Sequence, residues 1–205
     1  MNIKQSVAGV KVIPVLVLDD EKVAVELAKV LVDLGLPVLE VTLRTLNALR
    51  VIEKMASVDG AVIAAGTVLS EVQVQQCQSA GASFLVSPGC TQKLEAAALQ
   101  ANMPLLPGVA TASEVMQMAD SGFDFLKFFP AAINGGVNAL KALGGPLPHV
   151  SFCPTGGVNS NNLGDYLALK NVLCAGGSWL VTDQDVRERN WSEVQQKAQA
   201  LTHMV

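Results

Sequence analysis

The sequence predicts an α/β protein, a single-domain (β/α)8 TIM barrel that occupies residues 1–205. Three observations predict this fold. Short apolar runs alternate with longer segments of helical period, the first run lacks a following glycine-rich turn, and polar residues of catalytic type follow the ends of several runs. Eight strand–helix units in one domain are typical of a closed parallel barrel. An open doubly wound sheet is the alternative, but it usually has fewer strands and a glycine-rich turn after the first.

The strands are expected in the apolar runs. In chain order they are Val12–Leu18, Pro37–Thr42, Ala61–Ala65, Phe84–Val86, Pro104–Leu106, Asp124–Phe128, Val150–Phe152 and Val172–Cys174.

The segments between them carry apolar residues at helical spacing. The first shows this most clearly, with Val23, Leu27, Val30, Leu31 and Leu34 on one stripe. The expected helices are Glu21–Leu34, Leu46–Ser57, Ser70–Ala80, Gln92–Ala101, Ala112–Ser121, Asn134–Leu143, Asn161–Leu169 and Asp185–His203. Three of them are followed directly by a glycine, which predicts left-handed C-terminal caps at Gly35, Gly81 and Gly122.

Composition excludes several classes of protein. Half of the 205 residues are hydrophobic and 16% are charged, which indicates a globular chain. The net charge of −4 and the scattered basic residues give no sign of a nucleic-acid partner. No window offers the ~20 uninterrupted apolar residues of a membrane span. Residues 1–5 do not resemble a secretory signal, so the cytoplasm is the expected location, and the four cysteines are expected to be reduced packing residues.

The second strand places charged residues on one face. Strict alternation puts Leu39 and Val41 toward the helices, and Glu40, Thr42 and Arg44 toward the barrel interior. Arg44 would then lie near the rim and Glu40 deeper. One interpretation is a buried Glu40–Arg44 ion pair that closes the interior. The other makes Glu40 an acid/base group and Arg44 a clamp for a substrate carboxylate.

Glycine pairs follow the last two strands, in Pro154-Thr-Gly-Gly157 and in Gly176-Gly-Ser178. Barrels commonly bind phosphate in these two loops, where backbone N–H groups can approach an anion. The alternative is that the glycines only form tight turns.

The sixth strand contains Lys127 among Phe125, Leu126, Phe128 and Phe129. A lysine there could snorkel or pair with Glu40 for structural reasons. The functional interpretation is a nucleophile, because desolvation favours the uncharged amine that imine formation with a ketone needs. With the phosphate loops and the carboxylate clamp, this lysine predicts a site for a phosphorylated 2-keto acid handled through a Schiff base.

Several segments carry a resemblance to a known family. They are Glu40-Val-Thr-Leu-Arg-Thr45, Ala65-Gly-Thr-Val68, Ser87-Pro-Gly89, Phe125-Leu-Lys-Phe-Phe-Pro-Ala131, Asn134-Gly-Gly136, Phe152-Cys-Pro-Thr-Gly-Gly157 and Gly176-Gly-Ser-Trp-Leu180. In order and spacing, from about Ile13 to Leu180, they resemble the 2-keto-3-deoxy-6-phosphogluconate (KDPG) aldolases, also called 4-hydroxy-2-oxoglutarate aldolases.

This resemblance implies a class I aldolase that works without a metal or other cofactor, usually as a homotrimer, in the Entner–Doudoroff pathway. Its residue roles carry over by position. Lys127 would form the Schiff base and Glu40 would be the general acid/base. The residues implied to bind substrate are Arg44 and Thr67 for the carboxylate, Pro88 and Phe129 for the pyruvyl group, and Thr155, Gly156, Gly157 and Ser178 at the phosphate end.

Two alternatives stay open. The first is a related barrel aldolase for the galactonate epimer or another 2-keto-3-deoxy acid. Relatives that use the galactonate epimer carry an arginine near the position of Val17, so its absence favours the gluconate type. The second is a barrel that binds a phosphorylated ligand without catalysis.

Overall fold

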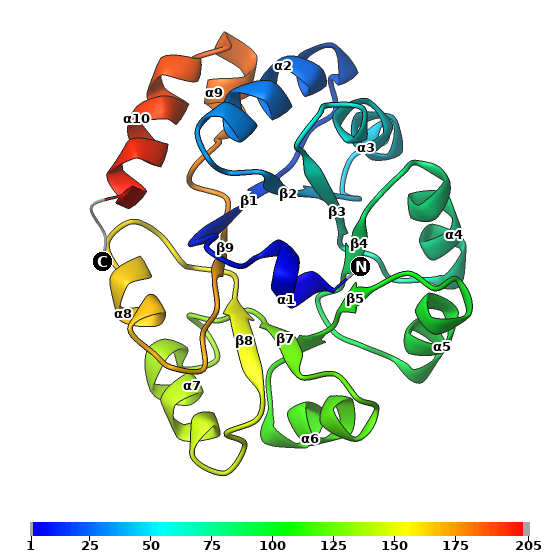
Figure 1. Ribbon diagram of the computed structural model, residues 1–205, viewed down its shortest axis with the longest axis vertical. Helices are drawn as coiled ribbons and strands as arrows, with labels where there is room; N and C mark the ends of the chain where they lie inside the picture. The colour runs from blue at the N-terminus through cyan, green and yellow to red at the C-terminus, as the bar shows by residue number, and fades with distance from the viewer. Residues whose placement is uncertain (1, 203–205) are drawn as a thin grey trace.

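The computed structural model describes residues 2–202 as a ring of parallel strands surrounded by helices (Figure 1). The strands are β1 (Val12–Leu16), β2 (Val38–Thr42), β3 (Val62–Gly66), β4 (Phe84–Val86), β5 (Leu105–Leu106), β6 (Gly108–Val109), β7 (Phe125–Phe128), β8 (Ser151–Pro154) and β9 (Ala175–Gly177). The helices are α1 (Ile3–Ser6), α2 (Glu21–Asp33), α3 (Ala48–Ala56), α4 (Glu71–Ser79), α5 (Gln92–Gln100), α6 (Ala112–Asp120), α7 (Gly136–Gly144), α8 (Leu163–Leu167), α9 (Asp183–Glu188) and α10 (Trp191–Thr202).

The hydrogen-bonded strand order is β5-β4-β3-β2-β1-β9 in one sheet and β6-β7-β8 in another. The two sheets join at both ends. Strands β5 and β6 are halves of one strand interrupted at Pro107, which has no backbone N–H to donate. The β8 and β9 segments are connected by two isolated bridges: Phe152 of β8 pairs with Val172, which precedes β9, and Thr155, which follows β8, pairs with Gly176 of β9. The predicted (β/α)8 barrel is therefore confirmed, with β5 and β6 together forming its fifth strand.

The eighth strand lies later than expected. The prediction was Val172–Cys174, whereas β9 begins at Ala175 and pairs with β1 through Ala175–Val12 and Gly177–Pro14. The glycines, which have low strand propensity, are thus part of the strand rather than of the loop after it. They fit there because two neighbouring side chains occupy the space of a Cβ: Thr155 against Gly176 and Trp179 against Gly177.

The last predicted helix is two helices. Helix α9 ends at Glu188 and is followed by Arg189, which has a left-handed φ of 49°. Helix α10 starts after Asn190, whose side-chain oxygen accepts a hydrogen bond from the backbone N–H of Glu193 at 3.3 Å. A local N-terminal cap therefore interrupts the helical pattern. The predicted end of this helix, His203, lies outside the described residues.

The helix ends at Gly35, Gly81 and Gly122 agree with the prediction. Their φ angles are 78°, 83° and 89°, which only glycine adopts at little cost.

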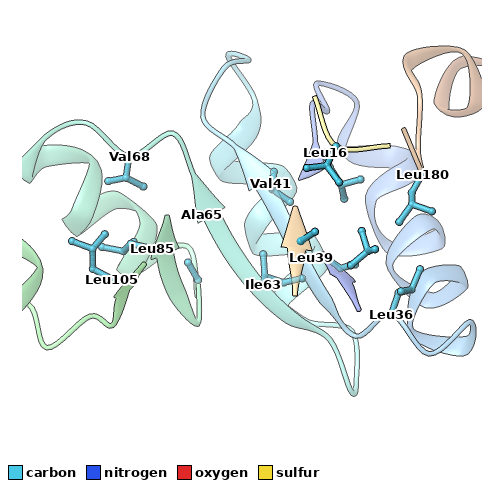
Figure 2. Packing of buried hydrophobic residues seen from close by; sticks show 14 of the residues in the cluster. Leu16, Leu36, Leu39, Val41, Ile63, Ala65, Val68, Leu85, Leu105 and Leu180 are labelled. Atoms are coloured by element: carbon cyan, nitrogen blue, oxygen red, sulfur yellow. The ribbon is translucent and has the colours of Figure 1, made fainter. Parts of the chain in front are cut away.

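Two apolar clusters hold the barrel together. The outer cluster lies between strands and helices and includes Leu16, Leu39, Ile63 and Leu85 (Figure 2). The inner cluster joins the segment before β1 to inward-facing residues of the strands. It consists of Val7, Val10, Ile13, Val38, Ala64, Phe84, Val86, Leu106, Phe125, Cys153 and Cys174. The short helix α1, which the sequence did not predict, crosses the barrel here (Figure 1). The polar side chains of the barrel interior therefore lie at the opposite end, the C-terminal rim.

None of the helices within residues 2–202 combines the length and the apolar character that a membrane crossing requires.

Candidate active site

Strand β2 brings its polar residues into the barrel, as its alternation predicts. Val38 belongs to the inner cluster, whereas Leu39 and Val41 belong to the outer one. Glu40 and Thr42 share the face of Val38 and are 3% and 2% exposed. The carboxylate of Glu40 therefore lies in the interior, above the inner cluster.

Strand β7 delivers the lysine from the opposite side of the ring. Phe125 packs in the inner cluster and Leu126 and Phe128 pack in the outer one, so Lys127 points inward. Its Nζ lies 5.4 Å from the centre of the Phe129 ring. An ammonium at this distance interacts favourably with an aromatic face.

Lys127 and Glu40 meet inside the barrel. The Nζ of Lys127 donates a hydrogen bond to Oε1 of Glu40 at 3.0 Å, and Lys127 is only 5% exposed. Among the described residues, the ion-pair partner of Glu40 is Lys127 and not Arg44, so the alternative of a Glu40–Arg44 pair is wrong. A carboxylate next to an amine in this position can accept the proton that the amine must lose before it attacks a carbonyl carbon.

Arg44 lies at the rim, above Glu40, as predicted. It follows β2, its side chain is exposed, and its Nε donates a hydrogen bond to Oγ1 of Thr42 at 3.2 Å. The guanidinium is therefore tied to the barrel while its end is open to solvent.

Thr67 and Pro88 reach the same rim from β3 and β4. Thr67 adopts a φ of 61°, a conformation that a β-branched residue rarely occupies. Strained backbone of this kind is concentrated at functional sites. The backbone of Pro88 lies so close to Gly108 of β6 that a side chain on Gly108 would overlap it. The backbone of Thr67 is thus in an unusual conformation, and the backbone of Pro88 is packed directly against β6.

The predicted phosphate loops lie at the ends of β8 and β9. Thr155 is buried at the end of β8, and Gly156 and Gly157 follow it with φ angles of 92° and 79°. Ser178 directly follows β9 and is exposed. The carbonyl of Gly156 accepts a hydrogen bond from Ala132 N–H at 3.0 Å, which fastens this loop to the segment after β7. Glycine is favoured at both positions because other residues adopt such positive φ angles only at a cost.

The sequence interpretation gave no role to Gly66, although it is in contact with the predicted base. Gly66 is the last residue of β3, and a Cβ on it would overlap Oε1 of Glu40. A glycine that ends a buried strand was the available signal, because such a residue often marks close approach of another group.

The four cysteines are free thiols. Burial raises the pKa of the Cys77 thiol to about 12, and a hydrogen bond with Cys153, together with burial, raises the pKa of Cys174. Thiols of this kind are poor nucleophiles. Within residues 2–202, no three or more His, Cys, Asp or Glu side chains are grouped as a metal site.

The family model for KDPG and KHG aldolases matches residues 3–197. The chain belongs to this aldolase family. Among curated members, the KHG/KDPG aldolase of Escherichia coli strain K12 is 51% identical over 173 residues, which cover 83% of this chain and 80% of the relative.

Two solved structures of aldolases of this family are also close. The KDPG aldolase of Legionella pneumophila, with pyruvate captured as a covalent carbinolamine, has a TM-score of 0.94 and 42% identity, covering 98% of both chains. The enzyme of Zymomonas mobilis ZM4, solved with 3-phosphoglycerate, has a TM-score of 0.89 and 44% identity, covering 96% of this chain and 93% of the other.

Proposed function

We propose that this chain is a class I aldolase that cleaves 2-keto-3-deoxy-6-phosphogluconate to pyruvate and glyceraldehyde 3-phosphate through a Schiff base on Lys127. We infer that it also cleaves 4-hydroxy-2-oxoglutarate to pyruvate and glyoxylate, since the Escherichia coli relative is named for both substrates. The observation that carries the proposal is the buried contact between Lys127 Nζ and Glu40 Oε1 at 3.0 Å. A carbinolamine is the adduct that an amine forms with the pyruvate carbonyl, and it has been captured in the Legionella relative.

The first half of the reaction forms the imine. Glu40 takes a proton from the ammonium of Lys127, and the free amine attacks the keto carbon of the substrate to give a carbinolamine. Glu40 then supplies the proton with which the hydroxyl leaves as water. The resulting iminium is an electron sink in a site with little competing solvent.

The second half breaks the bond between carbons 3 and 4. Its electrons move into the iminium to form an enamine, while the proton of the 4-hydroxyl passes to Glu40, directly or through a water, and the aldehyde departs. Glu40 returns this proton to carbon 3. Hydrolysis of the imine then releases pyruvate and restores the amine.

The remaining predicted residues would bind the two ends of the substrate. Arg44 and Thr67 bind the carboxylate, and Pro88 and Phe129 border the pyruvyl group. Thr155, Gly156, Gly157 and Ser178 bind the phosphate. The positions of Arg44 and Ser178 at the rim, above the buried lysine, support this arrangement.

Borohydride trapping tests the proposal. Treatment with pyruvate and borohydride should add a three-carbon adduct that mass spectrometry locates on Lys127. The matched variant Lys127→Arg keeps a positive charge beside Glu40 and should give no adduct. An adduct on another lysine, or none in the unaltered protein, would contradict the scheme and favour a barrel that only binds its ligand.

The substrate alternative is the galactonate epimer. Turnover of the two epimers, measured side by side, separates the two assignments. We expect the gluconate compound to be preferred because this chain lacks the arginine that galactonate relatives carry near the position of Val17.

We also propose that the chain forms a homotrimer and acts in the cytoplasm, as the family resemblance implies. Light scattering coupled to size-exclusion chromatography tests the trimer. A mass of one or two chains would contradict it.

A further inference from the structure

The side chain of Thr42 connects Arg44 to the neighbouring strand. Its Oγ1 donates a hydrogen bond to the backbone carbonyl of Leu16, at the end of β1, at 3.0 Å. The same oxygen accepts a hydrogen bond from Nε of Arg44 at 3.2 Å. Thr42 is 2% exposed whereas Arg44 is exposed, so a buried hydroxyl holds the base of a solvent-facing guanidinium.

The direction of these two hydrogen bonds is fixed by chemistry. A hydroxyl has one proton, and a carbonyl can only accept, so the proton of Thr42 is committed to Leu16. The free lone pair then faces Arg44, whose guanidinium can only donate. With Nε occupied, Arg44 keeps its two terminal nitrogens for a carboxylate. These form the end-on fork of two parallel hydrogen bonds.

The segment around Arg44 is tied on both sides of the arginine, to the end of β1 through Thr42 and to the loop after β1 through Thr45. On the other side, Oγ1 of Thr45 donates to the carbonyl of Leu18. Two further hydrogen bonds, each 3.1 Å, join Asn47 to Asp19. Thr45 thus makes the same kind of tie as Thr42, but no contact between it and the guanidinium is among those described. It provides a matched comparison.

We propose that Thr42 is a positioning residue, which holds the Arg44 guanidinium in the orientation that receives the substrate carboxylate. The proposal rests on the carboxylate-binding role proposed above for Arg44. An arginine side chain has high conformational entropy, and fixing it before substrate arrives lowers the cost of binding.

Variants at position 42 test the proposal through the hydroxyl alone. Thr42→Ser and Thr42→Ala lack the same methyl group and differ only in the oxygen. Thr42→Ala should lower kcat/KM for KDPG by about tenfold to a hundredfold, the size of one hydrogen bond to a charged group. The loss should appear mainly in KM. Thr42→Ser should stay within about threefold of the unaltered enzyme. Thr42→Val, which keeps the shape of threonine, should behave like Thr42→Ala if it folds.

A double-mutant cycle with Arg44→Gln separates positioning from general stability. If Thr42 acts through the guanidinium, Thr42→Ala should cause little further loss of kcat/KM once Arg44 is gone. For the control variant Thr45→Val, the change in kcat/KM should be the same in the Arg44→Gln background as in the unaltered enzyme.

Any one of three results would overturn the proposal. The first is an equal kcat/KM for Thr42→Ser and Thr42→Ala, and the second is a loss from Thr42→Ala in the Arg44→Gln background as large as in the unaltered enzyme. The third is a coupling between Thr45→Val and Arg44→Gln as large as that of Thr42→Ala. Failure of the proposed function is recognised separately, because it removes the pyruvate adduct from Lys127 in the unaltered protein. Failure of the Thr42 proposal leaves that adduct in place.

Discussion

The contact between Lys127 and Glu40 offsets the free-energy cost of burying either charge alone. An unpaired charge at either position would be buried at a cost of several kcal/mol, since the two residues are 5% and 3% exposed. Together they hold one proton and no net charge, whichever residue carries the proton. The same contact therefore suits both a structural ion pair and a nucleophile with its base. To distinguish the two, a variant must keep the hydrogen bond between the residues and remove only the proton transfer.

Glu40→Gln makes this distinction. Glutamine keeps the size and a hydrogen-bond acceptor beside Lys127 but cannot take up the proton of the 4-hydroxyl. We expect pyruvate still to be trapped on Lys127 by borohydride, but more slowly, because water must then carry the proton transfers of imine formation. The kcat for KDPG should fall about 10²–10⁴-fold. Single-turnover trapping and steady-state rates measure the two effects. Near-normal turnover would remove Glu40 from the role of acid/base group.

Gly66 should matter for the same carboxylate. The Cβ of an alanine there would overlap Oε1 of Glu40 and force the carboxylate to move. Because displacement of a catalytic group by about 1 Å can cost about 10²-fold, we expect Gly66→Ala to lower kcat by that order. The matched control is Gly164→Ala on α8, where a Cβ meets nothing within 4 Å. A Gly66→Ala enzyme with the kcat of the control would show that the carboxylate has room to shift.

At the scale of elements, β9 is the strand that the sequence misplaced. The apolar run before it resembles a strand, whereas the observed strand contains two glycines that propensity argues against. The side chain of Thr155 covers Gly176, and the ring of Trp179, two residues along the chain, covers Gly177. The contact with Thr155 comes from the end of the neighbouring strand and forms only when the barrel closes, so no local pattern contains it.

Strands β2 and β7 show the opposite case. Their alternation alone placed Glu40 and Lys127 on the inner face correctly, because each strand has one apolar side that must face the helices. The 3.0 Å contact between the two residues, 87 positions apart, depends in addition on the ring order of the strands. The side of each strand was predictable. For the partner of Glu40 the sequence left both Lys127 and Arg44 open, and the structure has Lys127.

Gly177→Ala tests the packing of β9. Its Cβ would overlap the Trp179 ring, so the indole must move, and overpacking of this type costs about 1–3 kcal/mol. We expect a lower Tm than for Gly145→Ala, where the nearest atom would be 3.6 Å from the new Cβ. In a Trp179→Ala background the penalty of Gly177→Ala should shrink. A penalty that is unchanged there would place the strain elsewhere than in the contact with Trp179.

At the scale of the whole molecule, the last two helices are joined to each other by one buried carboxylate. Asp185 of α9 is 4% exposed and accepts hydrogen bonds from Thr182 N–H at 2.8 Å and from Lys197 Nζ of α10 at 2.7 Å. Burial alone would raise the pKa of Asp185. The hydrogen bonds from Lys197 and Thr182, and the charge of Lys197, outweigh burial and lower the pKa below the ordinary 3.8.

The lowered pKa of Asp185 predicts a specific loss of stability in acid. Because the folded-state pKa lies below 3.8, the stabilisation is complete above that value and is lost as the pH falls through the folded-state pKa. Urea unfolding midpoints between pH 7 and pH 2.5 should therefore fall less steeply below about pH 4 for Asp185→Asn than for the unaltered protein. Lys197→Met should also make the midpoints fall less steeply, since it removes a partner that lowers the pKa of Asp185 and so brings the folded-state pKa closer to the unfolded value. If the urea midpoints of all three proteins fell in parallel with decreasing pH, other carboxylates would control the loss of stability in acid.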